Sequence, residues 1–267
     1  MQTETQLSDN EVDGVVPFGT LAFDIFASEY WNRTNDESQW TPLVAAYADL
    51  AWSVHYLYQI AASNIRGNIR EGRTPLQFKV PQALVLYQTP VERLISSKVV
   101  CRGLVDPIWL RTYYAANLDP TYRDMANRAT HLDRCGVDNG MILDDSSLYE
   151  YGEYWSRIFE RIPMLLDRVT DYDYANESSI SECTTPLEII PLDAVMVICV
   201  VDKNAIEEDL VKIKWLDRLG ECIWSNKIKP EDVPRMRDTL RHGGYLGGLL
   251  ADHAGTEKGA SGAVLSW

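Results

Sequence analysis

Six of the twelve prolines in this chain directly follow a threonine or an aspartate. A side-chain oxygen before a helix accepts a hydrogen bond from a free N–H of the first turn, and a proline at the next position already has a helical φ. Each such pair therefore indicates a helix start. The pairs are Thr41-Pro42, Thr74-Pro75, Thr89-Pro90, Asp106-Pro107, Asp119-Pro120 and Thr185-Pro186, and together they predict a mostly α fold.

The spacing of apolar residues supports several of these helices. Over residues 41–64 apolar side chains recur at steps of three and four in two adjoining rows. This predicts one long central helix, packed on more than one neighbour, with Gly67 as its stop. Further helices are expected at residues 21–31, 90–97, 107–116, 120–132, 147–162, 205–224 and 230–242. The few short strands are expected at residues 83–86 and 195–201, the second because β-branched residues are concentrated there.

We expect a single helical domain over residues 15–242, flanked by two segments of different composition. Residues 1–14 hold four acidic residues and no Lys or Arg, which predicts an acidic N-terminal arm and is unlike a secretory signal or transit peptide. Residues 243–267 hold seven glycines and end in apolar residues. They are expected to form a flexible Gly-rich C-terminal tail that docks on its own domain or on a neighbouring subunit.

Composition removes several classes of function. The net charge of −14 argues against a protein that coats nucleic acid along its length, because binding of that kind depends on neutralising phosphates. The five cysteines are odd in number and form no C-x-x-C pair. This argues against both a disulfide framework and a structural zinc site, and it favours a reducing compartment. The longest apolar stretch is too short to span a bilayer, so no membrane partner is expected.

Two clusters invite a catalytic interpretation. Asp144, Asp145 and Glu150 could present carboxylates to Mg²⁺ in an all-helical enzyme acting on a diphosphate substrate, but a step of five residues does not stack side chains on a helix. Helix capping by Asp145 or Ser146 is therefore favoured. His131, Asp133 and Cys135 are favoured as ordinary helix-end residues, because no further partner for a nucleophile or a metal is evident. No catalytic, cofactor-binding or metal residue is predicted, and the chain is not expected to be an enzyme.

Other residues are candidates for contacts with a partner. Tyr113 and Tyr114 could be anchors at a subunit contact, with core packing the favoured alternative. Leu265 and Trp267 could serve the same purpose at the end of the tail. Basic residues could contact RNA or another subunit, with a solvated face the favoured alternative; they are Arg66, Arg70, Arg73, Lys79, Arg235, Arg237 and Arg241.

The order of residues around the expected central helix resembles a known family. The aromatic pair Tyr30-Trp31, a short polar loop, the run Trp40-Thr41-Pro42-Leu43 and a long aromatic-rich helix resemble the capsid proteins of partitiviruses and related small double-stranded RNA viruses. The resemblance covers residues 29–75. It implies a mostly helical shell subunit, without enzymatic activity of its own, that assembles into a particle through extensive subunit contacts. No cofactor is expected.

These observations favour a structural viral coat protein that self-assembles into a capsid around an RNA genome, in the virion and the host cytoplasm. Its partners would be itself and the enclosed RNA, the latter through weak contacts, since an acidic lining leaves the polymer mobile. Two alternatives remain open. One is the Mg²⁺-dependent enzyme acting on a diphosphate, and the other is a cytosolic helical adaptor that binds other proteins.

Overall fold

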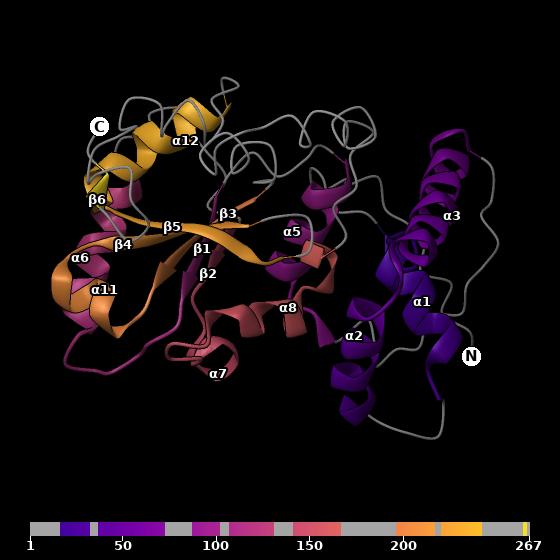
Figure 1. Ribbon diagram of the computed structural model, residues 1–267, viewed down its shortest axis with the longest axis horizontal. Coiled ribbons are helices and arrows are strands. Elements are labelled where there is room, and N and C mark those ends of the chain that lie inside the picture. Colours follow the sequence, from indigo (N-terminus) through magenta and orange to yellow (C-terminus); the bar gives the residue numbers. More distant parts are fainter. Residues whose placement is uncertain are drawn as a thin grey trace, which may run out of the picture.

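A computed structural model describes residues 17–32, 37–72, 87–101, 107–130, 141–166, 196–216, 220–241 and 264–265. Its central feature is a six-stranded mixed sheet in the order β2-β1-β3-β4-β5-β6 (Figure 1). The strands are β1 Ile108–Arg111, β2 Ile142–Leu143, β3 Met196–Val201, β4 Val211–Leu216, β5 Cys222–Ile228 and β6 Val264–Leu265. The expectation of a mostly α fold with few short strands is therefore wrong, and the chain has an α/β fold.

The sheet combines a parallel and an antiparallel half. β1 lies between β2 and β3 and is parallel to both, whereas β4 is antiparallel to both β3 and β5. β6 pairs in parallel with the end of β5. β3 is buried on both faces along its whole length, which explains its continuous run of apolar residues.

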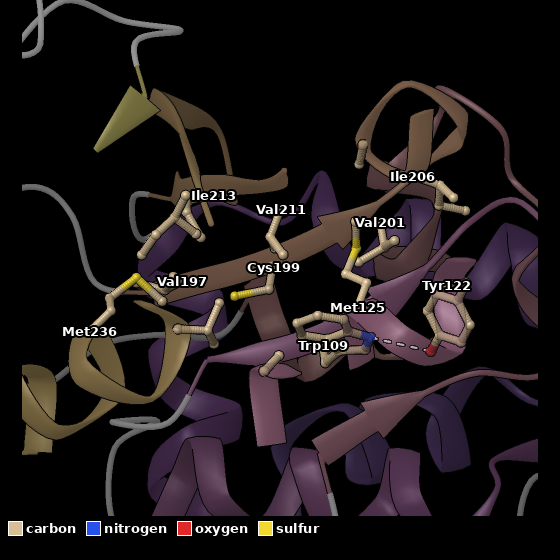
Figure 2. Close-up of a cluster of buried hydrophobic side chains, with 14 of the residues drawn as sticks. Trp109, Tyr122, Met125, Val197, Cys199, Val201, Ile206, Val211, Ile213 and Met236 are labelled. Atoms are coloured by element: carbon tan, nitrogen blue, oxygen red, sulfur yellow. Dashed lines mark hydrogen bonds between the residues drawn. The ribbon is translucent and has the colours of Figure 1, made fainter. Parts of the chain in front are cut away.

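Helices cover both faces of the sheet. One face packs against α6 Asp119–Thr130, α11 Lys203–Glu208 and α12 Val233–Arg241, and we call it the α12 face. Figure 2 shows part of this cluster, in which the indole nitrogen of Trp109 donates to the Tyr122 hydroxyl at 3.3 Å. The other face packs against α5 Pro90–Cys101, α7 Ser146–Tyr149 and α8 Ile158–Arg161.

The first three helices form a separate block at one end of the molecule. They are α1 Ala22–Tyr30, α2 Trp40–Ala48 and α3 Trp52–Arg70, and they share a third apolar cluster that includes Met164 (Figure 1). The block packs mainly on α8 and on the short helical turn Pro163–Leu166. Residues 29–72 of the capsid-like stretch thus fall within this helical block, apart from residues 33–36, which lie outside the described residues.

The prediction of one long helix over residues 41–64 is wrong, because α2 ends at Ala48 and a separate helix, α3, begins at Trp52. The rings of Tyr47 and Tyr58 lie 5.2 and 5.6 Å from the ring of Phe26 in α1. In one straight helix two residues eleven positions apart would be separated by about 16 Å along the axis. The break therefore lets both aromatic rings pack on α1. Gly67 does not end α3, which continues to Arg70 and stops before Gly72, whose φ is 69°.

The threonine–proline and aspartate–proline pairs have mixed outcomes. Thr89 begins α5 with a reciprocal cap, in which its Oγ1 accepts from the Glu92 N–H at 3.2 Å and its own N–H donates to Glu92 at 2.6 Å. Asp119 begins α6 as expected. The helix expected at 107–116 is wrong, because Pro107 is followed by the fully buried strand β1. Thr74 and Thr185 lie outside the described residues.

The remaining predictions divide in the same way. Residues 21–31 and 230–242 contain α1 and α12 as expected, and 195–201 contains β3. The helix expected at 205–224 is wrong, since only α11 is helical there and β4 and the start of β5 follow it. The helix expected at 147–162 is instead α7, a 3-10 turn and α8. The strand expected at 83–86 lies outside the described residues.

Candidate functional site

The helix α3 carries no acidic residue, although the chain as a whole is acidic. Leu57 and Ile60, one turn apart, expose 63% and 40% of their surface, and the same row continues through the exposed residues Ser53 and Asn64. We call these four residues the α3 face. Acidic residues account for 39 of the 267 positions, yet none lies between Trp52 and Arg70. A row that exposes large apolar side chains without flanking charge is typical of a surface that contacts a partner.

An apolar groove lies on the neighbouring part of the helical block. It has a volume of about 610 Å³, and none of the residues that line it is charged. They come from α1, α2 and their connections: Phe26, Tyr30, Ser38, Gln39, Pro42, Leu43, Ala46 and Leu50. Tyr30 is 61% exposed at the edge of this groove.

Aromatic contacts hold α3 in place beside α1. Phe26 packs on Tyr30 at 4.8 Å and on Tyr58 of α3 at 5.6 Å. The Tyr58 hydroxyl donates to the Glu29 carboxylate at 2.7 Å, and burial together with this carboxylate raises the pKa of Tyr58. Because α1 contacts both α2 and α3, these rings connect the α3 face with the groove (Figure 1).

The exposure of Leu57 differs from what the sequence predicts. Leu57 belongs to one of the two apolar rows that suggested a helix packed on several neighbours, but α3 buries mainly the side that carries His55 and Ala62. The absence of Asp and Glu between residues 52 and 70 is the sequence signal that could have identified the α3 face. In so acidic a chain, a helix surface exposed to solvent would be expected to carry some acidic residues.

The structure separates the candidate basic residues into two groups. Arg66 lies on α3, where its Nη1 donates to the Thr20 carbonyl oxygen at 2.6 Å, and Arg70 ends the same helix. Arg235, Arg237 and Arg241 lie on α12, at the other end of the molecule (Figure 1). Arg73 and Lys79 lie outside the described residues. The two described arginines of α3 therefore lie far from the three of α12, and a contact with RNA or a subunit remains a prediction for each group.

The aromatic and tail candidates lie against the protein's own core. Tyr113 packs half-buried on the α12 face, and Tyr114 packs on the opposite face, with its hydroxyl donating to the Arg111 carbonyl oxygen at 2.9 Å. Leu265 is 1% exposed in β6, so this part of the tail docks on its own domain. Trp267 lies outside the described residues.

The carboxylates of the magnesium hypothesis have structural partners. Asp145 is the N-cap of α7, where it accepts from the Ser147 N–H at 2.9 Å, so the capping interpretation is confirmed. Hydrogen bonds from Ser147 lower the pKa of Asp145. Within the described ranges no group of three or more His, Cys, Asp or Glu side chains is placed to hold a metal ion. His131, Asp133 and Cys135 lie outside those ranges.

Asp144 joins a charged cluster at the carboxyl ends of the parallel strands, where α/β sheets commonly bind ligands. The Arg111 guanidinium, at the end of β1, lies 2.7 Å from Asp119 and 3.4 Å from Asp144. It also stacks on Tyr114 and Tyr122, at 4.4 and 3.8 Å from the ring centres. Two carboxylates and two aromatic rings therefore already surround this guanidinium, which leaves it poorly placed to bind a phosphate.

A neighbouring loop also covers the end of β1. The Thr112 Oγ1 donates to the Gly152 carbonyl oxygen at 2.7 Å, and the Gly152 N–H donates back to the Thr112 carbonyl oxygen at 2.9 Å. Asp202, at the end of β3, caps α11 through the Ala205 N–H and is ion-paired with Lys212. This edge of the sheet is thus held together by contacts within the protein. The α3 face is the stronger candidate for a functional surface.

Comparison with known proteins adds no relative. No family model, no curated protein and no solved structure matches this chain. Among the described helices, none is both long and apolar enough to cross a membrane.

Proposed function

We propose that this protein is a structural subunit that associates with copies of itself, and that it is a coat protein of the kind that residues 29–75 resemble. The observation that carries the proposal is the α3 face, which presents Leu57 and Ile60 to solvent in a helix without acidic residues. The resemblance falls on the same helical block, so the two arguments concern one part of the molecule.

Charge favours a second copy as the occupant of this face. The chain carries a net charge of −14, whereas α3 carries two arginines and no acid. A face without acidic residues is the part of an acidic surface that a second acidic copy can approach with the least repulsion, because like charges opposite one another at a contact are costly. The apolar groove beside Tyr30 extends the contact to side chains of the same partner.

The test is the state of association of the purified full chain. Analytical ultracentrifugation at increasing concentration should detect oligomers, and negative-stain microscopy should detect particles. Leu57→Gln combined with Ile60→Gln should lower the association, whereas the melting temperature measured at a dilution where both proteins are monomeric should stay the same. Burying the exposed parts of both side chains contributes about 2 kcal/mol per copy, so a symmetric contact that uses each twice would weaken by about a thousandfold.

A matched control is Tyr154→Gln, because Tyr154 is 74% exposed and lies outside the helical block. This variant should associate like the wild type. A wild-type chain that stays monomeric at millimolar concentration would refute the proposal, as would equal association of the double variant and the wild type.

A further inference from the structure

The apolar groove of the helical block is a concave surface with room for side chains of a partner. Its volume of about 610 Å³ lies within the range of roughly 300–1,000 Å³ in which protein pockets enclose their ligands. None of the described residues that line it is charged. Phe26 and Leu43 are buried in its lining, whereas Ala46 is exposed on α2.

The α3 face has the pattern of a helix that binds in such a groove. Its residues Ser53, Leu57, Ile60 and Asn64 follow one another at steps of four, three and four, so they form one narrow row along α3. Helices that dock in apolar grooves present their anchors at this spacing. Leu57 and Ile60 are the two apolar anchors, and the residues at both ends of the row are short and uncharged.

The row and the groove are neighbours in the same molecule. Leu50 lines the groove and lies in the connection between α2 and α3, three residues before Ser53. Phe26 also lines the groove, and its ring lies 5.6 Å from the ring of Tyr58, which follows Leu57 in α3. A projecting and a hollow apolar surface side by side suit a two-fold contact, in which each surface of one copy meets the other surface of its partner.

The charge of the chain indicates which partner these surfaces can accept. A second copy carries a net charge of −14, and like charges that face one another at a contact are costly. The α3 helix has no acidic residue, and no described residue of the groove is charged, so two copies can approach one another here with little repulsion. The chain thus contains the apolar counterpart that each of the two surfaces requires.

We propose that Leu57 and Ile60 of one copy occupy the apolar groove of a second copy, and that the second copy forms the same contact in return. The dimer then contains two equivalent contacts between an α3 face and a groove. This inference rests on the proposed self-association and adds to it the surface on which the α3 face docks. It differs from a contact in which the α3 faces of two copies pack on each other.

A substitution in the groove tests this contact while the α3 face stays intact. Ala46 and its neighbour Ala45 are both exposed on α2, but only Ala46 lines the groove, so Ala45→Arg is a control with the same change in charge and helix propensity. In the analytical ultracentrifuge, Ala46→Arg should weaken association about a thousandfold, as the loss of Leu57 and Ile60 does. Ala45→Arg should associate like the wild type.

Ala46→Gln is a second groove variant, which adds a polar side chain and leaves the net charge unchanged. It should also weaken association. The melting temperature of each variant is measured at a dilution where all proteins are monomeric, and it should equal that of the wild type because position 46 is exposed.

A mixture of two variants gives a sharper test. Ala46→Arg keeps its α3 face, and the double variant Leu57→Gln, Ile60→Gln keeps its groove, so a mixed dimer can form one of the two contacts. The mixture should therefore associate about thirtyfold more tightly than either variant alone, which is the share of one contact in the thousandfold loss of two. In a contact between two α3 faces, mixing would recover nothing.

Two results would overturn the inference. In the first, Ala46→Arg associates like Ala45→Arg, which would mean that the α3 face docks elsewhere. In the second, both variants lose association and their mixture recovers none. Either result leaves the proposed self-association standing, because that is measured on the wild type alone.

Discussion

The buried ion pair between Asp24 and Arg93 should be the strongest single attachment between the helical block and the rest of the protein. Asp24 of α1 binds the Arg93 guanidinium of α5 through both oxygens, at 2.8 and 2.7 Å. It also accepts from the backbone N–H groups of Gly19 and Leu21. The two charged residues are 1% and 8% exposed.

The substitution Asp24→Ala removes these hydrogen bonds and leaves the Arg93 guanidinium buried without its counter-charge. Breaking a buried pair in this way costs about 3–5 kcal/mol, because the remaining charge is not compensated. For a chain of this size such a loss should lower the melting temperature by about 10 °C. The Arg93 contacts with the Pro17 carbonyl oxygen and the Phe18 ring remain, and they set the lower end of this range.

The free energy of unfolding is measured by urea titration of the wild type, of each single variant and of the double variant Asp24→Ala, Arg93→Met. The double variant should be more stable than the sum of the two single losses predicts, because it buries no unpaired charge. Lys203→Ala is the matched control. Its partner Glu207 lies 3.8 Å away on the exposed side of α11, and such a pair contributes less than about 1 kcal/mol. A loss below about 1 kcal/mol for Asp24→Ala would refute the reasoning.

Three further predictions concern a glycine, a cap and a surface carboxylate. Gly220→Ala should destabilise the protein by more than about 1 kcal/mol in urea titration, because its φ is 78° and the added Cβ would lie 2.7 Å from Leu166. Thr89→Ala should cost about 1 kcal/mol of unfolding free energy, since it removes the cap of α5. The hydrogen bond from the Arg111 guanidinium lowers the pKa of Asp119 below its usual value of 3.8. The stabilisation by this carboxylate is therefore complete above pH 3.8, and it is lost as the pH falls through the lowered pKa of the folded protein. Asp119→Asn should remove this acid-dependent part from a series of unfolding titrations below pH 5.

Local signals in the sequence predict local structure well. Thr89 caps α5 and Asp145 caps α7, because a cap depends on residues only two or three positions away. The helix α6 begins at Asp119, whose carboxylate is ion-paired with Arg111 and Arg123. The β-branched run that became β3 is recognisable for the same reason. At Asp106-Pro107 the pair is misleading, because the following residues Ile108–Arg111 are buried between two parallel strands.

The α/β fold itself depends on contacts between distant residues, which no local pattern contains. β1 pairs with residues of β3 that lie ninety positions later, for example Leu110 with Val200. A better clue was available in β4, where Val211, Ile213 and Trp215 alternate with lysines at the period of a strand. The α3 face is also invisible to periodicity, because it depends on which side of α3 packs on α1.

The wrong fold class does not remove the basis of the coat-protein proposal, because the two arguments concern different parts of the chain. The missed strands all lie after residue 107, whereas the described residues of the stretch 29–75 form only helices. The helical block is attached through α5, α8 and the Pro163–Leu166 turn, and its ion pair with Arg93 anchors α1 directly beside α3. A partner that binds Leu57 and Ile60 would therefore contact a helix that is fixed to the rest of the protein. Such an attachment suits a subunit whose contact surface must keep its place during assembly. Because Asp24→Ala loosens α1, on which α3 packs, it should weaken association as well as stability.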